Sequence, residues 1–298
     1  MKKLKYLYLF LFLFLLSSCI KEIKIKTDTI EKLPVINCIF SPDSVFKVYV
    51  CLPIEITSAE PYYVEDANVT ITGNNNTKLQ LYYTGKNGIY KSTQKPKINV
   101  LYTLEAKVQD YKTVKASDMI PEPVVIDNVE YYYDYDVLNN DSISMSRITF
   151  TDDYIIENFY DYNVFFINED GKKIYSTEPH YFKFTPDNVL LAEGDIEFFP
   201  NSFFFSDDYF NGQTYILSVP FGNSDYKEFR TTSKSYYLFR KFWTRHYYYQ
   251  NNDRNIGNGL SDIDFLDILN MSDPIEMYTN IENGYGIFAG YSCDVWLY

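Results

Sequence analysis

The chain has 298 residues, with 40 Asp and Glu against 27 Lys and Arg, and a formal net charge of −13 at pH 7. An acidic chain of this kind does not bind nucleic acid or an anionic membrane surface through charge. Tyr and Phe are frequent, with 31 and 23 copies, and both residue types favour β-strands. The composition therefore predicts a β-rich protein of about two domains, with no nucleic acid among its partners.

The first nineteen residues follow the plan of a secretory signal. Three lysines precede an uncharged apolar run from Tyr6 to Leu16. This run is shorter than the about 20 apolar residues that a membrane-spanning helix needs. The run ends in Ser17-Ser18-Cys19, which resembles the lipobox of bacterial lipoproteins. Residues 1–19 are therefore interpreted as a lipoprotein signal peptide with lipidation at Cys19, and an ordinary secretory signal with an incidental cysteine is the alternative.

Residues 20–32 are rich in charge and predict a tether that holds the folded part away from the membrane. Short apolar strands separated by turns follow, and no helical period interrupts them. The strands predicted here are Pro34–Phe40, Val45–Leu52, Ala67–Thr72, Lys78–Thr84, a short one from Gly88, Tyr102–Val108 and Lys112–Ala116. This pattern predicts an immunoglobulin-like β-sandwich over residues 33–120.

The segment Ile120–Pro123 is the predicted boundary between two separately folding domains. Its two prolines each lack a backbone donor and restrict the residue before them, so the segment is a stiff linker. The second domain, residues 124–298, is predicted to be β-rich and to carry one helix. Its predicted strands are Val124–Tyr133, Ser144–Phe150, Asp161–Ile167, Lys172–Ser176, Thr214–Pro220, Ile287–Tyr291 and Val295–Tyr298.

The predicted helix spans Ser233–Tyr249, because apolar residues recur on one face and Thr232 or Ser233 can cap its amino end. A second, short helical segment is predicted over Leu260–Leu269. Tyr, Trp and Arg are the residue types that dominate interface energies. The candidate interface on the long helix is therefore Tyr236, Tyr237, Arg240, Trp243 and Arg245. The alternative is that these aromatic side chains pack on the sheet.

Several segments of the chain are similar to one known family. They include the lipobox, VINCIFSPDSVFKVYV, ANVTIT, GIYKSTQKP, YTLEAKV, YKTVKASDMIPEPV and, most specifically, DPIEMYTNIENGYGIFAG from Asp273 to Gly290. The chain resembles the group of Bacteroidetes lipoproteins that carry domain of unknown function 4249. The resemblance covers nearly the whole mature chain and is weakest from about Asp134 to Asn211. It implies an envelope lipoprotein often encoded beside a TonB-dependent outer-membrane receptor, and it supplies no catalytic residues.

The most specific of these segments has two interpretations. Asn280, Asn283, Gly284 and Gly286 favour a turn, because Asn and Gly tolerate positive φ angles. The structural interpretation is a turn that leads into a central strand. The alternative is a ligand loop built from the same four residues.

Catalytic chemistry is not predicted. The two histidines, His180 and His246, have no nucleophile motif beside them. The acid pairs Asp152-Asp153 and Asp207-Asp208 cannot each form a dyad, because adjacent strand residues point to opposite faces, and solvated turns are expected. No catalytic residue, cofactor or metal site is therefore predicted. A bridge between Cys38 and Cys51 is left open, with buried free thiols favoured.

The expected function is that of a non-enzymatic binding or docking accessory of a TonB-dependent outer-membrane uptake system. The lipid on Cys19 would anchor it to the outer membrane, on the periplasmic or the surface face. The alternative is a glycan-binding module, or a glycan-active enzyme, that uses aromatic platforms. A concave cleft with paired carboxylates would favour the enzyme. An exposed apolar patch would favour docking.

Overall fold

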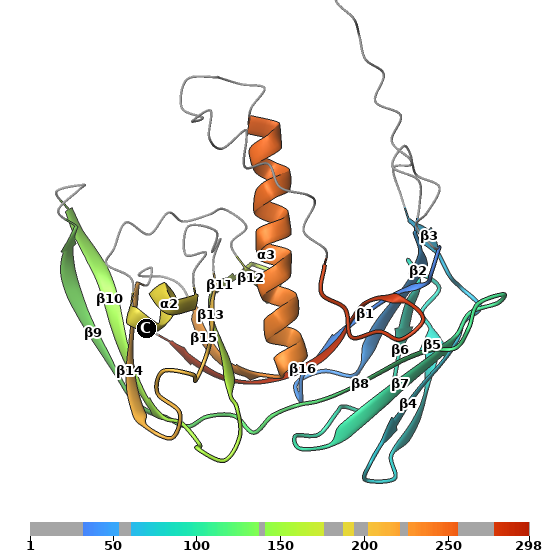
Figure 1. Cartoon of the computed structure of the whole chain (residues 1–298), viewed down its shortest axis with the longest axis horizontal. Helices are drawn as coiled ribbons and strands as arrows, with labels where there is room; N and C mark the ends of the chain where they lie inside the picture. The colour runs from blue at the N-terminus through green and yellow to red at the C-terminus, as the bar shows by residue number, and fades with distance from the viewer. Residues whose placement is uncertain are drawn as a thin grey trace, which may run out of the picture. The chain divides into compact units, whose positions relative to one another are not determined.

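One long strand links two hydrophobic cores in the computed structural model of the chain (Figure 1). This strand, β16, spans Tyr285–Leu297. Its first residues pair in parallel with β1, Val35–Phe40, and its later residues pair antiparallel with β15, Tyr226–Thr232. The structure describes residues 32–53, 61–136, 141–175, 187–193, 202–220, 226–255 and 277–297. The residues from Leu33 onward form one compact unit.

The remaining elements divide between two halves of this unit. The first half contains β2 Lys47–Leu52, β3 Tyr62–Tyr63, β4 Asn68–Gly73, β5 Lys78–Tyr83, β6 Ile89–Lys91, β7 Leu101–Lys107 and β8 Val114–Met119. The second half contains β9 Ile126–Asp136, β10 Asp141–Thr151, β11 Phe159–Ile167, β12 Lys173–Tyr175, α2 Asn188–Glu193, β13 Ser202–Ser206, β14 Thr214–Pro220 and α3 Lys234–Asn255.

The first half folds because its strands alternate buried apolar and exposed polar residues. The strands follow the order β16-β1-β2-β6-β5-β4-β7-β8, and Lys115 of β8 returns to exchange two backbone hydrogen bonds with Glu282, just before β16. The enclosed core includes Phe40, Phe46 and Tyr102. Phe288 of β16 also enters this core, with its ring centroid 4.7 Å from that of Phe40.

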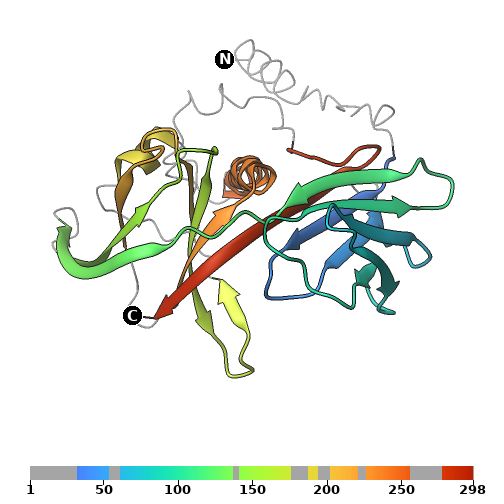
Figure 2. The same cartoon turned by 90° about the horizontal axis from the view of Figure 1, so that it is seen from below.

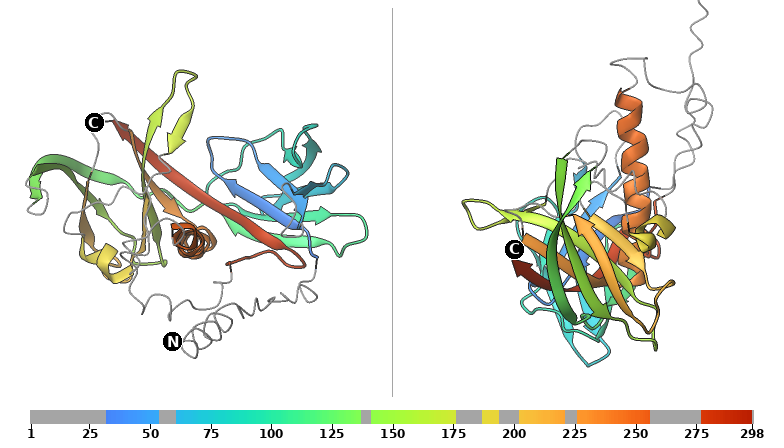
Figure 3. Two further views of the ribbon diagram at one scale, coloured as in Figure 1. Left: turned by 90° about the horizontal axis from the view of Figure 1, so that it is seen from above. Right: turned by 90° about the vertical axis from the view of Figure 1, so that its left-hand side faces the viewer.

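The second half has two sheets that face each other. Strands β13, β11, β15 and β16 are hydrogen-bonded in one sheet, and β14, β10 and β9 form a separate three-stranded sheet. Aromatic rings fill the space between them, and the ring centroids of Phe150 on β10 and Phe229 on β15 are 5.0 Å apart. Helix α3 contacts β16, β11 and β13, and its axis projects outward from the sheet (Figure 3).

The predicted mostly β, sandwich-like fold is confirmed, and so is the long helix. Ser233 caps α3 as expected, because its Oγ accepts a hydrogen bond from Tyr236 N at 3.2 Å. Two predictions need correction. The strands predicted at Ile287–Tyr291 and Val295–Tyr298 belong, as far as the structure describes them, to the single strand β16 (Figure 2), which ends at Leu297. The elements β3, β13, β15 and α2 were not predicted. The helical segment predicted at Leu260–Leu269 lies outside the described residues.

The cysteines of the first half are free thiols, as favoured from the sequence. The β1–β2 register places Cys51 opposite Val35, three positions along β1 from Cys38, so the two side chains do not face each other. Burial raises the pKa of the Cys38 thiol to about 12. The domain boundary at Ile120–Pro123 stays a prediction, although β16 contributes to both halves.

Candidate functional site

The sheet face beneath α3 carries buried charged residues beside an apolar cluster in which Tyr236 contacts Ile287 and Ala289 of β16. Alternation along the strands places Asp161 of β11 and Arg230 of β15 on this face, directly opposite each other in register. Arg230 Nη1 lies 3.3 Å from Asp161 Oδ2, and both atoms are hydrogen-bonded at 2.8 Å to the hydroxyl of Tyr236 on α3. The helix is therefore held to the sheet by a buried polar network.

Glu228 extends this network toward β12. Its carboxylate lies 2.7 Å from Arg230 Nη2 and accepts a hydrogen bond from Tyr175 Oη at 2.9 Å. Burial tends to raise the pKa of Glu228, but the guanidinium of Arg230 outweighs it and holds the pKa below its ordinary value. Glu228 is thus the counterion of Arg230, and the network links β12, β15 and α3.

The predicted interface on α3 is corrected by burial at two of its five positions. Tyr236 is 3% exposed and Tyr237 is 7% exposed, so both lie in the core. Tyr237 stacks on Phe159 and donates a hydrogen bond to Glu193. Arg240 donates to Ser202. These residues bind α3 to its own sheet, as the alternative interpretation expected.

Trp243 and Arg245 are half-buried, and the Arg240 guanidinium lies 5.5 Å from the centroid of the Trp243 ring. The predicted interface is therefore not a continuous exposed patch.

The predicted ligand loop uses its amide groups within the chain. Asn280 forms two hydrogen bonds with the backbone of Phe288, at 2.7 and 3.0 Å, and Asn283 donates to Thr113 O at 3.1 Å. Asn283 lies in the turn and has a φ angle of 57°, and Gly286, the second residue of β16, has a φ angle of 110°. These contacts favour the structural interpretation, in which the turn leads into β16, whose Phe288 lies in the first core. A ligand role for these residues stays a prediction.

The two acid pairs behave differently from the expected solvated turns. Asp153 and Asp208 are exposed, but Asp152 and Asp207 are buried. Asp152 accepts hydrogen bonds from Tyr160 Oη and, at 2.9 Å, from Gly212 N. The expectation failed because each pair lies at the junction of a strand and a loop, where only one member can point outward.

Asp207 also connects two loops, the β10–β11 loop and the β13–β14 loop, through hydrogen bonds to Asn158. Its Oδ2 accepts a hydrogen bond from Asn158 N at 2.7 Å, and its own N donates to Asn158 O at 3.1 Å. Burial raises the pKa of Asp207, and the neighbouring charge of Asp152 adds to the rise. These carboxylates accept from groups of the loops themselves. Their arrangement therefore joins the β10–β11 loop to the β13–β14 loop.

The joined loops carry an exposed apolar surface, which we call the apolar tip. It consists of Tyr154, Ile155, Ile156 and Tyr209, all exposed, with Tyr154 at 76% and Tyr209 at 71%. The backbone beneath is fixed, because Asn158 Nδ2 donates to Asp153 O and Ile156 O, and Ile155 N donates to Asp153 Oδ1. Aromatic side chains on a rigid base are suited to binding, since little entropy is lost on contact.

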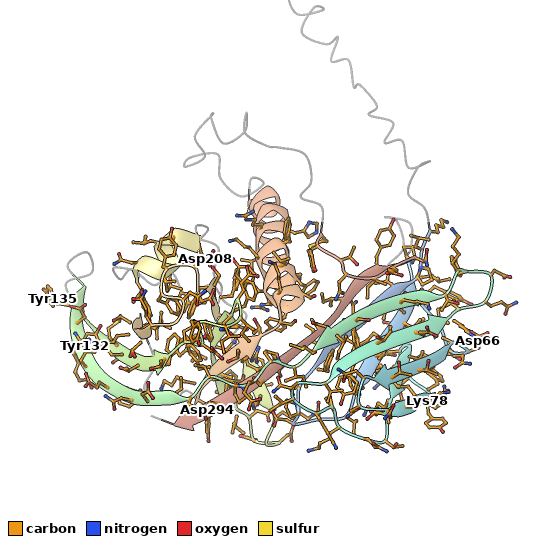
Figure 4. The ribbon with its side chains drawn as sticks, turned by 60° about the horizontal axis from the view of Figure 1, so that its bottom comes forward. Asp66, Lys78, Tyr132, Tyr135, Asp208 and Asp294 are labelled. Atoms are coloured by element: carbon orange, nitrogen blue, oxygen red, sulfur yellow. The ribbon has the colours of Figure 1, made fainter. Side chains whose placement is uncertain are left out.

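Acidic side chains lie next to the apolar tip in the sequence, and one of them, Glu157, is ion-paired with Lys234 of α3 at 2.9 Å. Asp153, Glu157 and Asp208 are exposed on the same two loops. Figure 4 places Asp208 in the second half, away from Asp66 and Lys78 of the first half. Sequence reasoning missed this surface, because the loops are adjacent only in the folded chain. The run Tyr154-Ile155-Ile156 after an acid pair was the available signal.

In the part of the chain that the structure describes, no cluster of three or more His, Cys, Asp and Glu side chains could hold a metal ion. Within the same residues, no helix is long and apolar enough to cross a membrane. His246 lies half-buried on α3, and His180 is outside the described residues.

The fold and the surface together define a β-rich protein with two cores, one shared strand and an exposed apolar loop surface. The chain belongs to the family described as Domain of unknown function (DUF4249), whose model matches residues 20–294. This match spans both halves and most of β16, and it confirms the domain family named in the sequence analysis. A comparison with curated proteins found no match.

Proposed function

We propose that this protein is a lipid-anchored, non-enzymatic docking accessory of a TonB-dependent uptake system in the outer membrane of Bacteroidetes. The observation that carries the proposal is the apolar tip. Two buried carboxylates hydrogen-bond to the backbone of the two loops that carry these four exposed apolar side chains. Exposed apolar patches on rigid loops are typical of protein interaction sites.

The anchor is the second part of the proposal. The signal-like order of residues 1–19 ends at Cys19, and the matched family begins at residue 20. One acyl chain anchors weakly, whereas several hold firmly, so a lipid-modified Cys19 would keep the protein at the membrane. The tether, residues 20–32, would then let the apolar tip reach a neighbouring receptor.

Charge indicates the kind of receptor surface that fits. Residues 121–298 contain 29 Asp and Glu against 11 Lys and Arg, a net charge of −18. Acidic residues also lie next to the apolar tip in the sequence. The complementary surface is therefore an apolar pocket with basic residues around it, and an anionic membrane surface would be repelled.

The test is copurification of the full-length protein from native membranes in mild detergent. The double variant Tyr154→Ser, Tyr209→Ser removes the two most exposed rings of the apolar tip. We expect a TonB-dependent receptor to copurify with the parent and to be reduced about 30-fold or more with the variant, as for hot-spot residues. Tyr62→Ser is the matched control, since Tyr62 is 67% exposed in the first half.

Two further arms separate the parts of the proposal. Cys19→Ser should leave an unlipidated precursor, detected by the loss of labelled fatty acid. Fatty acid incorporation by that variant equal to the parent would show that the anchor is wrong. Equal receptor recovery with Tyr154→Ser, Tyr209→Ser would remove the apolar tip from the interface. Turnover of a glycan or peptide by the parent, abolished by changing one acidic residue, would overturn the non-enzymatic role.

A further inference from the structure

A second exposed surface lies on the outer face of the first half. Lys47 of β2 is directly opposite Lys91 of β6, and Lys91 is directly opposite Tyr82 of β5. All three side chains are exposed, while the alternating residues Val48 and Tyr90 are buried. The three side chains therefore form one row across three neighbouring strands, which we call the lysine row.

The lysine row is electrostatically unfavourable in the protein alone. Like charges directly opposite each other on a sheet are destabilising. Elsewhere on the first half a carboxylate relieves the charge, as at Lys115, whose Nζ lies 2.7 Å from Glu105 Oε1. Of the residues that the structure describes, no carboxylate lies within ion-pair distance of Lys47 or Lys91. Two lysines without a neighbouring carboxylate therefore favour an anionic ligand.

Local composition supports this interpretation. Residues 33–120 contain nine Lys and Arg against eight Asp and Glu, a net charge of +1, in a chain whose net charge is −13. The ammonium of Lys47 lies 4.8 Å from the ring centroid of Tyr49, the next outward residue on β2. Each end of the row thus combines an exposed tyrosine ring with a lysine.

We propose that the lysine row binds an acidic polysaccharide. Tyrosine rings present an apolar face for a sugar ring and a hydroxyl for its polar groups. Neighbouring strands lie about 4.8 Å apart, close to the length of one sugar unit, so successive strands can meet successive sugars. An extended peptide adds to the edge of a sheet, whereas β6 is already paired with both β2 and β5.

This surface is separate from the apolar tip and does not depend on it. The lysine row lies on strands of the first half, and the apolar tip lies on loops of the second half. The protein could then hold an acidic glycan and a receptor at the same time. Carboxylate and sulfate groups share the chemistry that a lysine ammonium recognises, and the experiment separates them.

The experiment measures binding of the full-length protein in mild detergent to polygalacturonate and to dextran sulfate. Fully methyl-esterified polygalacturonate keeps the sugar backbone and removes the charge. We expect binding to at least one of the charged polymers, no binding to the ester, and a fall in affinity as salt rises. The double variant Lys47→Gln, Lys91→Gln should bind about tenfold more weakly or worse.

The matched control is Lys112→Gln, Lys115→Gln, which removes the same charge from exposed positions outside the row. It should bind like the parent, and Tyr82→Ala should weaken binding at unchanged net charge. Equal weakening by both double variants would mean that only net charge matters and would overturn the site. Absence of binding to both charged polymers would overturn it too. Tighter binding to polyglutamate than to either polymer would replace the glycan with an acidic peptide.

Discussion

Asp118 shows how a single half-buried carboxyl joins the two halves. It lies on β8 of the first half, and its Oδ2 accepts hydrogen bonds from the helix cap Ser233 and, at 3.1 Å, from Gly290 N of β16. Burial raises the pKa of Asp118 to about 6, and these hydrogen bonds only partly offset the rise. Neither contact could be read from the sequence, because Ser233 and Gly290 are both more than a hundred residues away.

Asp118 predicts a pH dependence of stability. Its folded pKa of about 6 exceeds the ordinary value of 3.8, so the folded state binds the proton more tightly than the unfolded chain. The stability from this group is therefore complete below pH about 4 and is lost as pH rises through about 6. Asp118→Asn keeps an acceptor oxygen and cannot ionise. Between pH 4 and 7, the parent should lose up to about 3 kcal/mol more unfolding free energy than the variant.

Urea unfolding at pH 4, 5, 6 and 7 measures this difference. Asp66→Asn is the control, because Asp66 is exposed. If Asp118→Asn follows the parent's pH dependence as closely as the control does, Asp118 does not titrate in this range.

At the scale of elements, the sequence predicted those strands that alternate or run apolar. Strand β15 was missed because Glu228 and Arg230 resemble an exposed loop in the sequence, whereas in the fold they neutralise each other beneath α3. Strand β13, with its core Phe203–Phe205, was missed because a short apolar run has no period that distinguishes strand from helix. The apolar tip was missed because the contacts that join its loops, Asp152 with Gly212 and Asp207 with Asn158, link residues 60 and 49 positions apart in the sequence.

The parallel pairing of β16 with β1 predicts a strict glycine requirement. Gly286 has a φ angle of 110°, and a Cβ there would lie 2.0 Å from Ile36 O. Gly286→Ala should therefore lower the unfolding free energy by more than about 3 kcal/mol, through both strain and displacement of β1. Gly85 has a φ angle of 77° with no heavy atom within 4 Å of its Cβ position, so Gly85→Ala should cost only about 1–2 kcal/mol.

Chemical denaturation measures the unfolding free energy that Gly286→Ala and Gly85→Ala each lose relative to the parent. Equal losses would show that the backbone angle alone matters and that β16 can shift away from β1 without cost.

At the scale of the whole molecule, the described part of the chain combines two cores with one connecting strand. The sequence predicted two domains with a boundary at Ile120–Pro123, and this boundary stays a prediction. Most residues of the first core come before that segment, and the second core comes after it. The sequence did not indicate that Ile281 and Phe288, near the far end of the chain, belong to the first core. Patterns along a strand predict its type but not its partners, so this link was beyond sequence reasoning.

Truncation after residue 276 tests this link. The shortened chain lacks β16, so the first core loses Ile281 and Phe288 and β15 loses a neighbour. We expect both halves to lose fixed tertiary structure, seen as loss of the near-ultraviolet circular dichroism signal and rapid proteolysis of each half. A protease-resistant fragment that covers residues 33–119 would instead show that the first half folds independently of β16.

The position of β16 also governs when the protein can fold. Val35 pairs with Tyr285, so the first core stays incomplete until nearly all of the described chain has left the ribosome. Pairings between such distant residues form slowly, and a nascent chain remains open meanwhile. This delay suits a chain that is predicted to cross a membrane by a secretory signal, because translocation of an unfolded chain would be complete before β16 closes the first core.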